Sequence, residues 1–165
     1  MKKIFLLAAA LMAGKCGWTQ VSNNLYNKML QGLLSHEAKE ISVSEVEAKK
    51  DSVVFLDARA CEEYEVSCIP GAQWIGYESF DSSRVAGLDK GLTLVVYCSV
   101  GYRSEKIALQ LESLGFERVY NLYGGIFEWK NQGHEVQTPQ GEVTERVHAY
   151  SRVWGIWLDA GKKVY

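Results

Sequence analysis

The chain has 165 residues, a formal net charge of −2, 47% hydrophobic residues and 23% charged residues. These values are ordinary for one globular domain with a proper core. Residues 1–20 hold three of the 18 basic side chains and no acidic one, so the remainder carries 15 basic and 20 acidic side chains, a formal charge of −5. Such an acidic chain argues against nucleic acid as a partner.

Residues 1–20 form a pattern typical of a signal peptide. Lys2-Lys3 precedes an apolar run of ten residues from Ile4 to Ala13, which is shorter than the ~20 residues of a membrane span. We therefore expect an exported, periplasmic protein. Lipoprotein anchoring through Cys16 is a weaker alternative, because Lys15 stands where a lipobox carries a small residue.

Several elements are predicted between residues 21 and 59. A helix within 21–39 is indicated by apolar residues on one face, and it either packs on the domain or extends from it. A short strand is expected over 41–43, followed by a helix to about Lys50 that begins with a capping box of Ser44 and Glu47. Residues 53–56 predict a buried strand, with Asp57 and Arg59 at its C-terminal end.

The next segment predicts a helix over 61–66, a strand over 73–75 and a helical piece over 82–87. Three cysteines follow the predicted signal peptide: Cys61, Cys68 and Cys98. A Cys61–Cys68 disulfide would suit an oxidising compartment, but the intervening helix puts the two far apart. No metal site is expected, because the chain has no C-x-x-C and its three histidines are scattered.

Cys98 begins the loop Cys98-Ser99-Val100-Gly101-Tyr102-Arg103-Ser104. The loop follows a predicted buried strand over 93–96 and precedes a predicted helix that ends near Gly115. Ligands of open α/β sheets bind at such strand ends, and loop amides with a helix N-terminus favour a thiolate. The alternative is a core cysteine that ends a strand. Gly101 and Arg103 favour a reactive cysteine, because they offer close ligand approach and a fixed cation.

Three motifs resemble those of single-domain rhodaneses, the thiosulfate sulfurtransferase family. The first is the Cys98 loop. The second is Leu56-Asp57-Ala58-Arg59 with Glu62-Glu63-Tyr64 and Ile69-Pro70-Gly71-Ala72, and the third is Leu122-Tyr123-Gly124-Gly125-Ile126-Phe127-Glu128-Trp129. The resemblance covers about residues 40–137. A strand is expected over 118–121 and a helix over 126–130. They continue a strand–helix alternation that predicts an α/β fold, with a mostly parallel sheet and helices on both faces.

The resemblance implies a sulfurtransferase in which the Cys98 thiolate takes the outer sulfur of a small anionic donor such as thiosulfate. A thiol or cyanide would then remove that sulfur from the persulfide. No cofactor is expected. The amides of Ser99 to Arg103 would hold the anion, and Arg103 would neutralise it. Ser104 would cap the helix or add a hydrogen bond, while Val100 and Tyr102 would shape the pocket.

The resemblance also assigns supporting roles to Asp57 and Arg59, with a surface salt bridge from Arg59 to Glu62 or Glu63 as the alternative. Cys68 stands where the family usually carries His. Its closeness to Cys98, and thus a role as a resolving thiol, cannot be read from the sequence.

Two other functions are compatible with these residues. Cysteine phosphatases and arsenate reductases share the strand–loop–helix device but place five residues between Cys and Arg, whereas this chain has four. A rhodanese-like binding module or persulfide carrier without turnover is the non-enzymatic alternative.

Residues 138–165 lie beyond the part that resembles the family. Residues 139–141 are expected to form a linker, and an aromatic-rich stripe over 147–158 predicts a helix. That helix would pack on the domain or, as the less favoured alternative, bind a protein partner.

Overall fold

The computed structural model describes residues 21–165. The predicted signal peptide, residues 1–20, lies outside the described residues. Among the described residues, no helix has the length and apolar character needed to cross a membrane.

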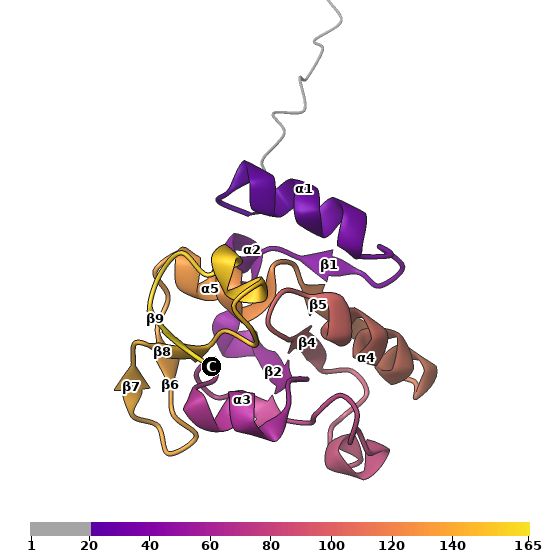
Figure 1. Cartoon of the computed structure of the whole chain (residues 1–165). Helices are drawn as coiled ribbons and strands as arrows, with labels where there is room; N and C mark the ends of the chain where they lie inside the picture. Colours follow the sequence, from indigo (N-terminus) through magenta and orange to yellow (C-terminus); the bar gives the residue numbers. More distant parts are fainter. Residues whose placement is uncertain (1–20) are drawn as a thin grey trace, which may run out of the picture.

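The centre of the fold is a five-stranded parallel sheet (Figure 1). The strands lie in the order β1-β5-β4-β2-β3, which places the strand before Cys98 in the middle. This arrangement confirms the predicted α/β class. The strand bounds are β1 Glu40–Ile41, β2 Val53–Asp57, β3 Gln73–Trp74, β4 Thr93–Tyr97 and β5 Arg118–Leu122.

Helices cover both faces of the sheet. Helix α4 packs on one face, and α1, α2 and α5 contribute to the hydrophobic cluster on the other. Three 3₁₀ turns complete the helical elements. The bounds are α1 Asn24–Leu33, α2 Val43–Glu47, α3 Cys61–Val66, α4 Tyr102–Ser113 and α5 Gly125–Asn131, with η1 Lys50–Ser52, η2 Ser82–Val85 and η3 Trp154–Trp157.

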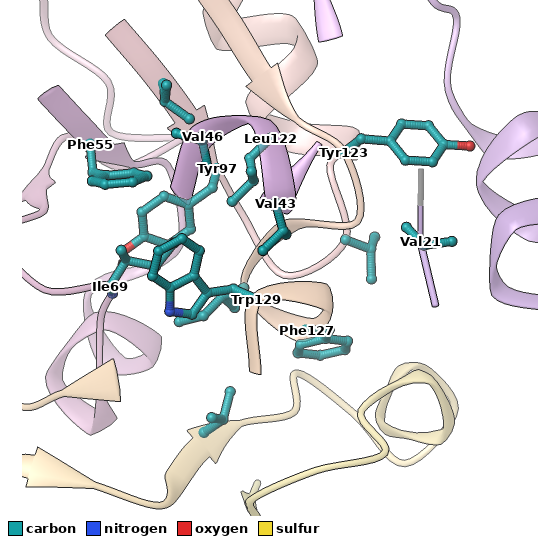
Figure 2. Close-up of a cluster of buried hydrophobic side chains, with 14 of the residues drawn as sticks. Val21, Val43, Val46, Phe55, Ile69, Tyr97, Leu122, Tyr123, Phe127 and Trp129 are labelled. Carbon is teal, nitrogen blue, oxygen red and sulfur yellow. The ribbon is translucent and has the colours of Figure 1, made fainter. Parts of the chain in front are cut away.

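Strands β2 and β4 divide their side chains between two hydrophobic clusters. Phe55, Val95 and Tyr97 face the cluster that contains α5. Leu56 and Val96 face the cluster on the α4 side. Successive side chains thus alternate between the two faces of the sheet, and those on both faces are apolar, as in strands buried on both faces. Figure 2 shows Phe55 and Tyr97 with Trp129 and Ile69 in the first cluster. The Phe55 and Trp129 rings pack edge to face, with 5.6 Å between their centroids.

The predicted capping box at Ser44 and Glu47 is wrong by two residues. The Ser42 hydroxyl accepts from the Glu45 amide at 3.3 Å, and the Glu45 carboxylate accepts from the Ser42 amide at 2.9 Å. Helix α2 begins at Val43 because Val43 and Val46, three residues apart, then bury the same face. The preceding strand is correspondingly shorter than predicted and ends at Ile41.

The predicted C-terminal helix is also wrong. Residues 136–165 instead contain four short strands and the turn η3: β6 Val136–Gln137, β7 Val143–Thr144, β8 Arg146–His148 and β9 Lys162–Val164. Val147 and Ala149 are fully buried with exposed or half-buried neighbours, so the pattern that buries this stretch has period two rather than 3.6. The segment packs back on the domain beside α3 and α5 (Figure 1).

Candidate active site

Cys98 lies directly after the central strand β4, and α4 begins four residues later at Tyr102. Gly101 joins the loop to the helix with a φ of 117°, a backbone conformation that glycine adopts without strain. Its amide donates to Cys98 Sγ at 3.1 Å. The thiol is only 1% exposed, but it lies at the floor of a cavity that Val100 and Tyr102 also line.

Helix α5 holds this loop from behind. The Ile126 amide donates to the Cys98 carbonyl at 2.9 Å, and the Phe127 amide donates to the Ser99 carbonyl at 3.2 Å. Gly125 makes this approach possible, because a Cβ there would lie 2.3 Å from the Cys98 carbonyl oxygen. The first two carbonyls of the loop are therefore fixed by α5, whose close approach depends on Gly125.

Asn121, at the end of β5, fixes the other end of the loop. Its side chain donates to the Gly101 carbonyl at 3.1 Å and accepts from the Ser104 hydroxyl at 2.7 Å. Ser104 Oγ also lies 3.1 Å from the Gly101 carbonyl. Ser104 thus stands inside the first turn of α4 and does not cap the helix, whose N-cap is Gly101.

Arg103 is paired with a carboxylate that the sequence analysis did not assign to the site. Its guanidinium donates to both Glu63 oxygens, at 2.6 and 2.9 Å, and to Ser99 Oγ at 3.0 Å. Ser99 Oγ in turn donates to Glu63 at 2.9 Å. Helix α3 places Glu63 there, and Glu63 also accepts from the Ala60 amide. Arg103 therefore closes the loop by a bidentate ion pair, and Glu63 already balances the charge that we expected to neutralise an anionic donor.

The surroundings of Cys98 favour its thiolate. Burial acts to raise the pKa of the thiol, but the positive charge of Arg103 and hydrogen bonds from Ser104 and Gly101 outweigh it and lower the pKa. A lowered pKa at a strand–loop–helix junction is the condition for a nucleophilic cysteine. The arrangement can therefore attack an electrophilic sulfur and hold the anionic product.

Asp57 and Arg59 form a buried pair behind the site. Both side chains are fully buried, and their closest atoms are 2.6 Å apart. Arg59 also donates to the Ser67 carbonyl at 2.6 Å, while its own carbonyl accepts from the Trp74 ring at 2.9 Å. The alternative of a surface salt bridge from Arg59 to Glu62 or Glu63 is therefore wrong. The pair connects β2, the end of α3 and β3, which is a framework position.

Cys61, Cys68 and Cys98 are all free thiols, so no Cys61–Cys68 disulfide is present. Cys61 is exposed, and Cys68 is buried with its backbone paired to Gln137. Within residues 21–165, no group of His, Cys, Asp and Glu side chains could hold a metal ion.

The site contains residues that the sequence analysis missed or placed elsewhere. Glu63 stood in the second motif, but nothing in the sequence showed that it faces Arg103. Asn121 lies in a segment for which the sequence indicates only a strand. Tyr150 and Trp154 line the cavity above Cys98 from the C-terminal segment, which does not form the predicted helix.

Comparison with known proteins agrees with this geometry. The sequence model of the family of rhodanese-like domains matches residues 42–132, more than half of the chain. The chain is 30% identical over 106 residues to a sulfurtransferase from Allochromatium vinosum, covering 64% of this chain and 98% of that protein. It is 36% identical over 97 residues to the tRNA uridine(34) hydroxylase of Cytophaga hutchinsonii, covering 55% of this chain but only 31% of that protein.

Among solved structures, a rhodanese-like domain protein from Staphylococcus aureus superposes with a TM-score of 0.53 at 26% identity, covering 61% of this chain and 97% of that one. The sequence motifs, the parallel sheet and the matched domain model point to one conclusion. The chain belongs to the rhodanese-like family.

Proposed function

We propose that the protein is a sulfurtransferase that carries a sulfane sulfur on Cys98. The observation that carries this proposal is the Cys98 thiol at the floor of an open cavity, with the Gly101 amide 3.1 Å from Sγ. The lowered pKa of this thiol and the sulfurtransferase from Allochromatium vinosum support it. We do not extend the hydroxylase activity to this chain, which spans about a third of the length of that relative.

The proposed reaction has two displacement steps. The Cys98 thiolate attacks the outer sulfur of thiosulfate, the new S–S bond forms, and sulfite leaves with the electrons of the broken bond. An acceptor nucleophile, such as cyanide or a thiolate, then attacks the outer sulfur of the persulfide. The electrons of that S–S bond return to Cys98, and thiocyanate or the acceptor persulfide leaves.

Arg103 serves this reaction through the thiolate and the loop. Because Glu63 balances its charge, Arg103 offers a dianionic donor less attraction than a free guanidinium would. Its charge still favours the Cys98 thiolate, and its bonds to Glu63 and Ser99 fix the loop. We infer that the donor is held mainly by loop amides, as the Gly101 contact illustrates.

The same ion pair argues against a phosphatase or arsenate reductase. The Glu63 carboxylate accepts hydrogen bonds from Arg103 and Ser99 that an oxyanion on the thiol would need. With four residues rather than five between Cys98 and Arg103, the ring is also narrower. Sulfur on the thiolate needs less room than a tetrahedral oxyanion.

Mass spectrometry of the intact protein tests the proposal. Thiosulfate should add one sulfur atom to the wild type and none to the matched Cys98→Ser variant, and cyanide should remove that sulfur as thiocyanate. Repeated thiocyanate release would show an enzyme, and one equivalent per chain would show a carrier without turnover. Hydrolysis of aryl phosphates with no persulfide would overturn the proposal.

We further propose that the protein is exported to the periplasm after removal of residues 1–20. The described structure supports a boundary near Val21, which is buried, while the Ser22 amide donates to the Glu128 carboxylate at 2.7 Å. The N-terminus of protein from the cell envelope should lie between Cys16 and Val21. A chain that begins at Met1 in the cytoplasm would overturn this proposal.

A further inference from the structure

The cavity above Cys98 is far larger than a thiosulfate ion requires. Its volume is about 820 Å³, which lies within the range of sites for drug-sized organic ligands. The Cys98 loop forms the floor, and the walls come from the start of α3, the segment after β3 and the C-terminal segment. The cavity therefore has room for an organic acceptor beside the Cys98 persulfide.

The walls of this cavity are aromatic and acidic. The lining includes five aromatic residues and the acidic residues Glu62 and Glu78. Its cation, Arg103, is already paired with Glu63. Aromatic faces and carboxylates together attract organic cations. The five aromatic residues are Trp74, Tyr77, Tyr102, Tyr150 and Trp154.

The C-terminal segment holds its part of the wall under backbone strain. Tyr150 has a φ of 62°, which is an unusual value for a bulky residue. Its amide donates to His148 Nδ1 at 3.1 Å, and its ring lies over the Arg103 guanidinium at 5.1 Å. Parallel pairing of β8 with β9 fixes the segment on both sides. Strain of this kind is characteristic of ligand sites.

We propose that this cavity binds the sulfur acceptor, and that the acceptor is a low-molecular-weight thiol carrying an amino group. This inference rests on the proposed function, since it names the acceptor of the same Cys98 persulfide. The ammonium group of the acceptor would be attracted by the aromatic rings and by Glu62 and Glu78, which line the same cavity as Cys98. The thiolate of the acceptor then reaches the outer sulfur of Cys98.

The transfer step balances without another reactant. The acceptor thiol loses its proton to solvent, and its sulfur electron pair forms the new S–S bond with the outer sulfur. The old S–S bond breaks, and its electrons remain on Cys98 as the thiolate. The product is the persulfide of the aminothiol.

A matched acceptor series tests this inference. Protein preloaded with sulfur from thiosulfate is mixed with cysteamine, 2-mercaptoethanol or 3-mercaptopropionate, and loss of the persulfide is followed by mass. We expect rates per thiolate to fall from the cationic to the neutral to the anionic acceptor, by about tenfold or more overall. The ammonium group lowers the thiol pKa and weakens intrinsic nucleophilicity, so such a preference reflects binding. Equal rates, or a preference for the anionic thiol, would overturn the proposal.

Variants of residues in the cavity wall test whether the wall causes the preference for the cationic thiol. Tyr150→Gly removes the ring and suits the positive φ, and Glu62→Gln removes one carboxylate. Both should lower the ratio of cysteamine to mercaptopropionate rates severalfold, whereas Tyr150→Phe should keep it. The matched controls Ile156→Ala, an exposed residue of η3, and Glu65→Gln, an exposed residue of α3, should leave the ratio unchanged. Equal effects of controls and wall variants would contradict the assignment.

A binding measurement separates this proposal from the proposed function. The Cys98→Ser variant, which forms no persulfide, is titrated with each thiol while tryptophan fluorescence is followed, because Trp74 and Trp154 line the cavity. Cysteamine should change the fluorescence saturably at lower concentration than the other two thiols. Absence of that difference would overturn the acceptor proposal, even if thiosulfate loads Cys98 normally. Failure of thiosulfate to load wild-type Cys98, with selective cysteamine binding intact, would count against the proposed donor reaction alone.

Discussion

Two cysteines in this domain are equally buried but have opposite acid–base properties. Cys98 and Cys68 are each 1% exposed. The pKa of Cys98 is lowered, because Arg103 and hydrogen bonds from Ser104 and Gly101 outweigh its burial. Burial, together with the carboxylate of Asp57, raises the pKa of Cys68 to about 11. Burial alone therefore does not decide whether a cysteine is inert.

The difference follows from where each cysteine lies relative to the sheet. Cys98 directly follows the central strand, where the Gly101 amide before α4 faces the sulfur. Cys68 lies after α3, where its own amide and carbonyl pair with Gln137, at 2.7 and 3.0 Å. Backbone hydrogen bonds lower the pKa of Cys98, whereas the pKa of Cys68 is set by burial and by neighbouring side chains. The comparison predicts that the two cysteines will differ when each is replaced, and that changes around Cys98 will alter its reactivity.

Replacing the sulfur atoms one at a time should give the largest contrast. Cys98→Ser should abolish sulfur transfer, because no persulfide can form, while the fold is kept. Cys68→Ser should retain most of the activity in a thiocyanate assay, because its thiol is protonated and takes no part in the chemistry. A Cys68→Ser protein that is folded but as inactive as Cys98→Ser would show that Cys68 acts as a second essential thiol.

Disturbing the support of the Cys98 loop should give the next largest effect. The test variant is Gly125→Ala, and the control is Gly133→Ala, which introduces a side chain at a φ of 84° with open space around it. The control should cost about 1–2 kcal/mol of unfolding free energy, because only the backbone conformation is strained. Gly125→Ala adds a clash with the Cys98 and Ser99 backbone, and it should cost about 1–3 kcal/mol more than the control.

Urea unfolding measures both glycine variants, and persulfide formation should fall only in Gly125→Ala. Equal stability and activity of the two variants would contradict the role of α5 in holding the loop.

Removing the carboxylate that pairs with Arg103 should have a moderate and directional effect. Glu63→Gln leaves the Arg103 charge uncompensated, so the pKa of Cys98 should fall further and KM for thiosulfate should decrease. Stability should fall by about 1–3 kcal/mol, because hydrogen bonds to a charged group are lost. Glu65→Gln on the same helix is the control. An unchanged KM would show that Glu63 does not limit attraction of the donor.

Much of the central domain could be predicted because its signals are local. The run of residues from Leu94 to Tyr97, all buried, a turn glycine at Gly101 and a periodic helix after it determine the strand–loop–helix unit. These signals predict that Cys98 lies in the loop between the strand and the helix. The motif of Gly124 and Gly125 was recognised, but its physical role became visible only in the hydrogen bonds from α5 to the loop.

The remainder depended on contacts between residues far apart in the chain. Glu63 and Arg103 are 40 residues apart, and their pairing depends on where the fold places α3 relative to the start of α4. The stripe over 147–158 contains apolar residues at helix-like intervals, but pairing of β8 with β9 and the burial of Val147 and Ala149 overrode that periodicity. Local propensity is a weak guide where tertiary packing decides.

The smallest effect, and the most direct test of the comparison between the two cysteines, is the pH dependence of stability. The lowered pKa of Cys98 contributes stability above the unfolded value of about 8.5, and this contribution is lost as pH falls through the folded value. The raised pKa of Cys68 contributes stability below about 8.5, which is lost as pH rises toward 11. The two contributions therefore change in opposite directions with pH.

Urea unfolding of wild type, Cys98→Ser and Cys68→Ser at several pH values between about 6 and 10 measures these contributions, in the range where an unperturbed thiol titrates. The stability difference between wild type and Cys98→Ser should grow with pH, and that between wild type and Cys68→Ser should shrink. Each slope should stay below about 1.4 kcal/mol per pH unit, the limit for one proton. Slopes of the same sign would mean that both thiols experience the same field. The amides and Arg103 around Cys98 would then not be what distinguishes the two cysteines.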